Sequence, residues 1–199
     1  MKIGVIDSGR GGLYIKEKLQ KLDSSIEVIN YIPPFFRSYG SMSIEQLEKE
    51  CDTHIKYLKE KDVNIIVVGC MTLSTNCLKY IKSISGSTVV LDLYTCLPKL
   101  CEECIAIFAT PKTIESGKFN EMKRIKCDTL ARVIEKDMGS KLIRGMLRGY
   151  ERGPYIKGCH GIILGCSHYF WAEQEFSDVY YLPIINPCNY LIEKVKKLL

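Results

Sequence analysis

The sequence contains two similar stretches, "NIIVVGCMTLSTN" at residues 64–76 and "HGIILGCSHYF" at residues 160–170. In each, an apolar run ends at Gly-Cys and polar residues follow. A short apolar run bounded by turn residues is typical of a strand that is buried on both faces. We therefore expect both Gly-Cys pairs at the carboxyl ends of buried strands. The repetition predicts two similar half-domains, each of which presents one thiol from the same structural position.

Further apolar runs recur along the chain and alternate with amphipathic stretches. The other expected strands are "KIGVID", "IEVINYI", "TVVLDLY", "CIAIFAT" and "VYYLPII". Between them, Ile15, Leu19 and Leu22 form one helical stripe, and Ser43 with Gln46 matches a capping box at a helix start. Strands that alternate with helices predict an α/β fold, here two similar doubly wound parallel-sheet half-domains that face each other across a cleft.

The predicted division assigns residues 1–93 with 184–199 to the first half, which carries Cys70. Residues 94–183 form the second half, which carries Cys166, and we expect the chain to cross between the halves around Leu93 to Cys104. In such sheets the ligand crevice lies beyond the carboxyl ends of the strands. Both Gly-Cys pairs and the "DSGRGG" stretch after the first strand are expected at this edge.

Composition and charge exclude several classes of protein. The chain has 199 residues, of which 46% are hydrophobic, and its 28 basic and 23 acidic residues are interspersed, so no nucleic-acid footprint is predicted. The basic patch at Lys194–Lys197 reads as the solvated face of a C-terminal helix. No apolar run approaches the ~20 residues of a membrane-spanning helix, so no membrane partner is expected. The ten cysteines lie within apolar segments, and no signal peptide precedes "KIGVID"; both features favour reduced thiols in a cytoplasmic protein.

Two thiols at matching positions suggest a specific chemistry. The residues after Cys70 and Cys166 are helix-like, and a helix N-terminus favours the thiolate form of a nearby cysteine. One thiolate and one thiol on opposite sides of a carbon can remove a proton from one face and return a proton to the other. This arrangement inverts a stereocentre.

Six motifs carry a family resemblance. In order along the chain, "IGVIDSGRGGL", "RSYGSMS", "VGCMTLSTN", "FATPKTIESGKF", "CDTLARVIE" and "LGCSHYF" resemble the motifs of glutamate racemases in the cofactor-independent aspartate/glutamate racemase superfamily. The resemblance implies that Cys70 and Cys166 are the two catalytic bases, with Asp7 near the first and Glu135 and His168 supporting the second. The substrate-binding positions that it implies are Asp7, Ser8, Tyr39, Gly40, Met71, Thr72, Thr113, Ser167 and His168.

The function implied by this resemblance is the interconversion of L- and D-glutamate without an organic cofactor or a metal. The expected partner is a small amino-acid dicarboxylate. A role for D-glutamate would point to the supply of cell-wall (peptidoglycan) precursors. A homodimer is expected only from the resemblance.

The sequence departs from the family pattern at several points. Met71 stands where the family usually has Asn, Ser38 replaces Pro before Tyr-Gly, Arg10 replaces a small apolar residue, and the chain is shorter between Glu135 and His160.

Several alternatives stay open from the sequence. The chain is also compatible with an aspartate racemase or another small-dicarboxylate isomerase, and with a degenerate, non-catalytic binding protein that retains the cleft. Cys101 and Cys104 form a C-x-x-C that is compatible with a redox pair or half a zinc site, although no second pair stands at ribbon spacing. His54 lies in a charged helical stretch and is expected to be exposed.

Overall fold

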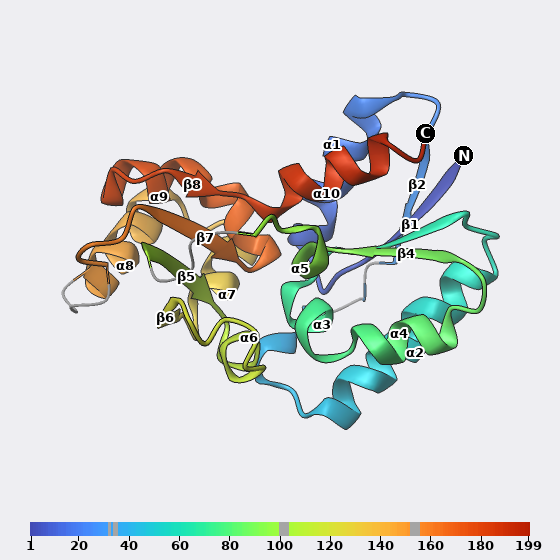
Figure 1. Ribbon diagram of the computed structural model, residues 1–199, viewed down its shortest axis with the longest axis horizontal. Coiled ribbons are helices and arrows are strands. Elements are labelled where there is room, and N and C mark those ends of the chain that lie inside the picture. Colours follow the sequence, from blue (N-terminus) through green and yellow to red (C-terminus); the bar gives the residue numbers. More distant parts are fainter. Residues whose placement is uncertain (32, 34–35, 100–103, 152–155) are drawn as a thin grey trace.

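The computed structural model describes residues 1–31, 33, 36–99, 104–151 and 156–199 and has two lobes, each built on a parallel sheet (Figure 1). The first sheet has the spatial order β2-β1-β3-β4. Its strands are β1 (Lys2–Ile6), β2 (Glu27–Asn30), β3 (Ile65–Val68) and β4 (Val89–Asp92). All three pairings between them are parallel.

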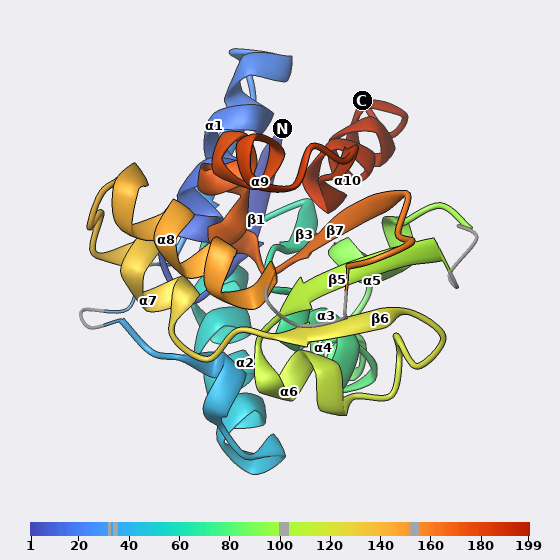
Figure 2. The same ribbon diagram turned by 90° about the vertical axis from the view of Figure 1, so that its left-hand side faces the viewer.

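The second sheet repeats this topology with the order β6-β5-β7-β8. Its strands are β5 (Ile105–Ala109), β6 (Lys123–Lys126), β7 (Gly161–Gly165) and β8 (Ile184–Ile185), again all parallel. Figure 2, turned toward this lobe, shows β5, β6 and β7 as neighbouring ribbons. In both sheets the strand that comes first in the sequence lies second in space. The predicted α/β fold with two similar parallel sheets is confirmed.

Helices follow the strands in each lobe. In the first lobe they are α1 (Arg10–Leu22), the 3-10 turn η1 (Tyr39–Ser41), α2 (Ile44–Lys59), α3 (Met71–Asn76), α4 (Leu78–Ile84) and α5 (Leu93–Cys96). In the second they are α6 (Pro111–Glu115), α7 (Leu130–Glu135), α8 (Ser140–Glu151), the 3-10 helix η3 (Ser167–Ala172) and α9 (Glu173–Tyr180). The last helix, α10 (Pro187–Lys196), contacts α1, α5 and β4 of the first lobe.

The first sheet is covered on both faces, as a doubly wound sheet requires. In β3, Ile65 and Val67 belong to one hydrophobic cluster, and Ile66 and Val68 belong to another. The first cluster contains side chains of α1, α5 and α10, whereas the second contains side chains of α2, α3 and α4. The continuous apolar run of β3 follows from this burial, because both strand faces meet helices.

The apolar stripe and the capping box predicted from the sequence are both present, in α1 and α2. Ile15 and Leu19 of α1 are fully buried, and the Ser43–Gln46 capping box opens α2 with both of its hydrogen bonds formed. At the other end of the chain, Val195 is buried while Lys194 and Lys196 are exposed. The basic patch of α10 is therefore a solvated helix face.

Two strand predictions differ from the structure. β6 was missed because its sequence, Lys-Arg-Ile-Lys, buries only Ile125 at the edge of the sheet. In "VYYLPII", Val179 and Tyr180 complete α9, and only Ile184–Ile185 pair as a strand. Apolar content alone did not separate the buried end of this helix from the strand that follows it.

The predicted division of the chain stays a prediction, but both of its boundaries differ from the packing. The predicted second half begins at Tyr94, whereas α5 (Leu93–Cys96) contacts α3, β4 and α10 of the first lobe. Residues 184–199 were assigned to the first half, whereas Ile184 and Ile185 pair with Ile162 and Ile163 of β7 in the second sheet. α10 then returns to the first lobe. Of the C-x-x-C pair, Cys101 lies outside the described residues.

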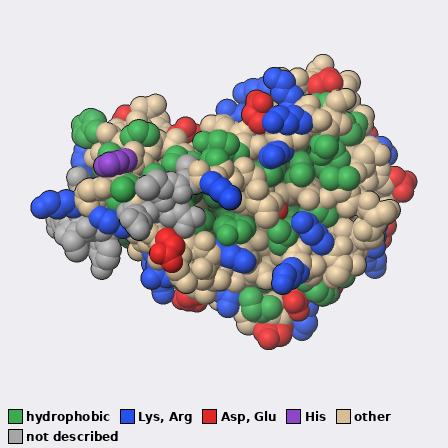
Figure 3. All heavy atoms as spheres, in the orientation of Figure 1, with side chains coloured by type: hydrophobic (Ala, Val, Ile, Leu, Met, Phe, Trp, Pro, Cys, Tyr) green, Lys and Arg blue, Asp and Glu red, His purple; other side chains and the backbone are tan. Residues whose placement is uncertain are grey.

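The surface is mixed in charge. Figure 3 shows lysine and arginine side chains scattered among acidic and neutral ones on the face drawn. Within the described ranges, none of the helices has the length and apolar character needed to cross a membrane.

Candidate active site

Four strand ends converge on one small cavity between the lobes. Ser8 follows β1, Cys70 follows β3, Thr110 follows β5 and Cys166 follows β7. The lining residues are Ser8, Phe36, Ser38, Tyr39, Gly40, Cys70, Thr72, Thr110, Ala131, Cys166, Ser167 and His168. The cavity has a volume of about 20 Å³, which is room for about one water molecule. The carboxyl edges of the two sheets therefore face each other, and the two thiols meet in one cavity.

Both thiols occupy the same position relative to a helix. Cys70 is the residue before α3, and Cys166 is the residue before η3. The backbone N–H groups of Leu73 and Thr72 donate toward the Cys70 sulfur, as expected at a helix start. The glycine before each cysteine allows close packing: a Cβ at Gly69 would lie 2.6 Å from Ile15 Cδ1, and one at Gly165 would lie 2.7 Å from Ala109 Cβ.

The glycine-rich turn after β1 inserts into the second lobe. A Cβ at Gly9 would lie 2.6 Å from Glu135 Oε2, and one at Gly11 would lie 2.2 Å from Ser167 Oγ. A Cβ at Gly9 would displace the Glu135 carboxylate, and a Cβ at Gly11 would press on the Ser167 side chain and on its backbone carbon at 3.0 Å. The close approach of the two lobes therefore explains Gly9 and Gly11, whereas a Cβ at Gly12 would meet Asn30 and Asp7 of the first lobe.

A relay of side chains lies behind Cys166. His168 Nδ1 is 3.7 Å from Cys166 Sγ, and His168 Nε2 is 2.8 Å from Glu135 Oε2. Burial by itself would lower the pKa of His168, but its hydrogen bonds to Cys166 and Glu135 outweigh burial and raise the pKa to about 10. Burial would raise the pKa of Glu135, but hydrogen bonds from His168 and from the Arg10 backbone lower it. A cationic imidazole paired with a carboxylate is thus held beside the second thiol.

The first thiol has different surroundings. Burial raises the pKa of Cys70 well above its ordinary value, and the nearby negative charge of Asp7 adds to this effect. Burial also raises the pKa of Asp7, opposed chiefly by the positive charge of His168. Asp7 Oδ1 accepts a hydrogen bond from the Gly9 N–H at 3.1 Å, whereas Oδ2 is buried without a hydrogen-bond partner in the described part of the chain. Cys70 therefore carries its proton at neutral pH.

Three threonine hydroxyls form a ring at one wall of the cavity. Thr72 Oγ1 is 3.1 Å from Thr110 Oγ1 and 2.9 Å from Thr113 Oγ1, and Thr110 and Thr113 are 3.1 Å apart. Each hydroxyl can donate one hydrogen bond and accept others. The ring can therefore rotate its protons toward an anionic group that enters the cavity.

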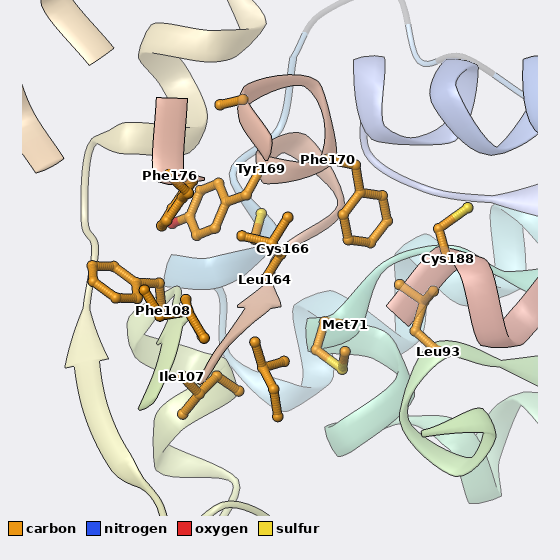
Figure 4. Packing of buried hydrophobic residues seen from close by; sticks show 14 of the residues in the cluster. Met71, Leu93, Ile107, Phe108, Leu164, Cys166, Tyr169, Phe170, Phe176 and Cys188 are labelled. Carbon is orange, nitrogen blue, oxygen red and sulfur yellow. The ribbon is translucent and has the colours of Figure 1, made fainter. Parts of the chain in front are cut away.

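Eight of the predicted site residues line the cavity, and four do not. The lining ones are Ser8, Tyr39, Gly40, Cys70, Thr72, Cys166, Ser167 and His168. Three of the others lie directly behind the lining: Asp7 precedes Ser8 in the chain, Thr113 bonds Thr72 and Glu135 bonds His168. Met71 is 1% exposed and packs in the core; Figure 4 shows it between Ile107 of the second sheet and the pair Leu93 and Cys188.

The loop that carries Tyr39 is held by a buried network that sequence reasoning missed. The Tyr39 hydroxyl lies 2.9 Å from His54 Nε2 and donates to Glu50 at 3.3 Å, and Arg37 also binds Glu50. His54 is completely buried, so the expectation that it would be exposed is wrong. It lies on the α2 face with Leu47, Cys51 and Ile55. The helical spacing from Leu47 and Cys51 was a signal for this burial.

Burial lowers the pKa of His54 to about 4, which predicts a dependence of stability on pH. The unfolded chain takes up a proton at His54 near its ordinary pKa of about 6.5, whereas the folded chain does so only near pH 4. Stability is therefore lost as the pH falls from about 6.5 to 4, by on the order of 3 kcal/mol. We expect a His54→Leu variant to lack this contribution, as measured by denaturant unfolding at pH 7 and pH 4. An equal pH dependence in the two proteins would contradict the assignment.

Sequence reasoning also missed lining residues of the second lobe and of the loop. Thr110 could have been predicted from the sequence, because it is a hydroxyl residue directly after a buried strand. Phe36, whose ring lies edge-on to His168 with centroids 5.5 Å apart, carried no such signal. Among the described residues, His, Cys, Asp and Glu form no group of three or more that could hold a metal ion.

Comparison with known proteins shows what the chain is similar to. No protein-family model matches it. It is 28% identical to the glutamate racemase of Aliarcobacter butzleri over 90% of this chain and 76% of that protein, and 23% identical to the glutamate racemase of Clostridium novyi over 90% and 75%. The crystal structure of glutamate racemase from Francisella tularensis in complex with D-glutamate superposes with a TM-score of 0.89 at 23% identity and covers 99% of this chain and 80% of that one. Aspartate racemase from Picrophilus torridus shares the fold with a TM-score of 0.74 at 16% identity, over 100% and 93%. The resemblance predicted from the motifs is confirmed: the chain is similar to glutamate racemases over about nine-tenths of its length and has their fold.

Proposed function

We propose that this protein is a cofactor-independent racemase that interconverts L- and D-glutamate by proton transfer between Cys70 and Cys166. The observation that carries the proposal is that both thiols line one cavity from matching strand ends. The glutamate racemases to which the chain is similar support an isomerase of this kind. Supply of D-glutamate for peptidoglycan, a cytoplasmic location and a homodimer stay predictions.

The two thiols differ in a way that suits a two-base reaction. Cys70 holds its proton, because burial and Asp7 raise its pKa, and is therefore the acid in the protein without substrate. On the opposite side, His168 Nδ1 lies 3.7 Å from the Cys166 sulfur and can donate a hydrogen bond to it, so Cys166 is proposed as the base. Cys166 would remove the α-proton from one face while Cys70 donates to the other, and the roles reverse for the other enantiomer.

The carbanion-like transition state needs donors that are already in place. Ser8, Thr72 and Thr110 supply uncharged donors at the cavity, and Thr113 completes the hydroxyl ring behind the lining. Ser167 and His168 provide further donors on the Cys166 side for a second carboxylate. A dicarboxylate is much larger than the water-sized cavity, so the lobes or the Tyr39 loop must move apart before substrate enters.

Deuterium exchange tests this function. The protein is incubated in deuterated water with L-glutamate, D-glutamate or L-aspartate, while the α-proton signal is followed by NMR and the optical rotation by polarimetry. We expect loss of the α-proton signal and loss of optical rotation for both glutamate enantiomers, because inversion brings in a solvent deuteron. Exchange with aspartate alone would replace the proposal by the aspartate racemase alternative. Binding without exchange would support a non-catalytic binding protein.

A further inference from the structure

Arg10 connects the two lobes at the relay behind Cys166. It lies between Gly9 and Gly11 in the turn that inserts into the second lobe. Its backbone N–H donates to Glu135 Oε2 at 2.9 Å, and its carbonyl accepts from Trp171 Nε1 at 2.8 Å. Both backbone groups of one first-lobe residue are thus bonded to the second lobe.

The side chain of Arg10 adds two further contacts to the same region. Its Nη1 donates to the carbonyl oxygen of Ile134 at 3.1 Å, and its guanidinium lies 5.3 Å from the centre of the Trp171 ring. This second distance is within the range of a cation–π interaction. The ion pair with Asp137, at 3.5 Å, is weaker because the Asp137 side chain is 80% exposed.

The Arg10 N–H and guanidinium both contact the end of α7. Ile134 and Glu135 are the last two residues of α7, where the carbonyl ends of the helix dipoles favour a cation. The Ile134 carbonyl accepts from the Asp137 N–H at 3.0 Å as well as from Arg10. Glu135 Oε2 accepts from both the Arg10 N–H and His168 Nε2. The orientation of the carboxylate against His168 is therefore set jointly by the helix end and by the first lobe.

We propose that Arg10 is a positioning residue: its guanidinium fixes the end of α7 so that Glu135 stays bonded to His168, and the relay behind Cys166 is thereby complete only while the lobes are in contact. Arg10 does not line the cavity, so it acts through Glu135 and His168. Its effect on the reaction rests on the proposed function, whereas its effect on His168 does not.

The charged groups around His168 and Glu135 determine how the pKa of the His168 imidazole responds to a change at Arg10. His168 faces Cys166 and Glu135, and the negative charge of Asp7 also raises its pKa. Glu135 faces His168 and Arg10, with Asp137 at the rim. Loss of the guanidinium should loosen the bond between Glu135 and His168, which lowers the pKa of the imidazole. Relief of direct repulsion between Arg10 and His168 would act in the opposite direction.

The test is a histidine titration of the full chain by ¹⁵N NMR, in the absence of substrate. The chain has three histidines, and a His54→Gln and a His160→Gln variant assign their signals. We expect the midpoint of His168 to fall by about one pH unit in Arg10→Val and by less in Arg10→Lys, which keeps the charge. Arg144→Val is the matched control, since Arg144 forms an ion pair with Asp178 within the second lobe at similar exposure, and should leave the midpoint unchanged. An unchanged or raised midpoint in Arg10→Val would overturn the proposal.

A second variant covers the case in which Arg10→Val does not fold. Trp171→Phe keeps an aromatic ring under the guanidinium but removes the Nε1 donor to the Arg10 carbonyl, and should lower the His168 midpoint in the same direction by a smaller amount. If Trp171→Phe also leaves the midpoint unchanged, the proposal fails.

Racemisation assays separate this inference from the proposed function. In an active protein, Arg10→Val should lower kcat/KM about 10- to 100-fold, equally in both directions because the two enantiomers have equal free energies. The acid limb of its pH profile should move to higher pH, since Glu135 loses a contact that lowers its pKa. If the wild-type protein racemises no substrate while the His168 midpoint still falls in Arg10→Val, the proposed function fails and the positioning role stands.

Discussion

Cys70→Ser and Cys166→Ser are each expected to abolish racemisation while each retains proton exchange with one enantiomer of glutamate. A serine hydroxyl is too weak an acid and base to replace the thiol, so the rate of racemisation should fall about 10²- to 10⁴-fold. The remaining thiol can still remove a proton from the face that it meets and return a solvent deuteron to the same face. Because the two thiols approach from different lobes, the two variants should exchange opposite enantiomers.

The measurement follows α-proton loss by NMR separately for L- and D-glutamate in each variant. Cys96→Ser is a suitable control, because Cys96 is 7% exposed and Cys70 6% exposed, but Cys96 lies on α5 away from the cavity lining. It should racemise at nearly the wild-type rate. Exchange of the same enantiomer in both cavity variants would contradict the two-base geometry, as would full activity in either.

The strand ends are the part of the site that the sequence predicts well. β3 and β7 are apolar throughout because both of their faces are buried, and such runs are visible in one sequence. Where such a strand stops, the next residue lies at the sheet edge, so Cys70 and Cys166 could be placed without coordinates. β6 could not be found in this way, because an edge strand with one buried residue has no distinct pattern.

Side-chain partnerships depend on contacts that are distant in sequence and were not predictable from it. Arg10 and Glu135 are 125 residues apart, and nothing in either local stretch indicates that one accepts a hydrogen bond from the other. Thr72 and Thr113 are separated by 41 residues and meet only because their strand ends face each other. Met71 was expected to contact substrate, since the family places a polar residue there, but it packs in the core between the lobes.

Gly11→Ala is expected to weaken both stability and racemisation, although alanine is the better helix former by about 1 kcal/mol. Gly11 is the second residue of α1, and an added Cβ would lie 2.2 Å from Ser167 Oγ and 3.0 Å from the Ser167 backbone carbon. The turn would have to move away from the second lobe and would take Asp7 and Ser8 with it. We expect a loss of about 1–3 kcal/mol in the free energy of unfolding and a fall in kcat of at least about 10²-fold.

Denaturant unfolding and the racemisation assay measure the two effects, and Gly145→Ala is the matched control. Gly145 lies on α8, where an added Cβ meets no atom of the described residues within 4 Å, so alanine there should stabilise the protein by roughly 0.5–1 kcal/mol without a change in rate. Adding Ser167→Gly to Gly11→Ala removes the contacts at Ser167 Oγ and Cβ but not the one at its backbone carbon. Stability should therefore return only in part, whereas activity should stay low because the Ser167 hydroxyl is lost. A Gly11→Ala variant as stable and as active as the wild-type protein would contradict the tight packing of the turn between α7 and η3. It would also contradict the close contact of the two lobes at the cavity.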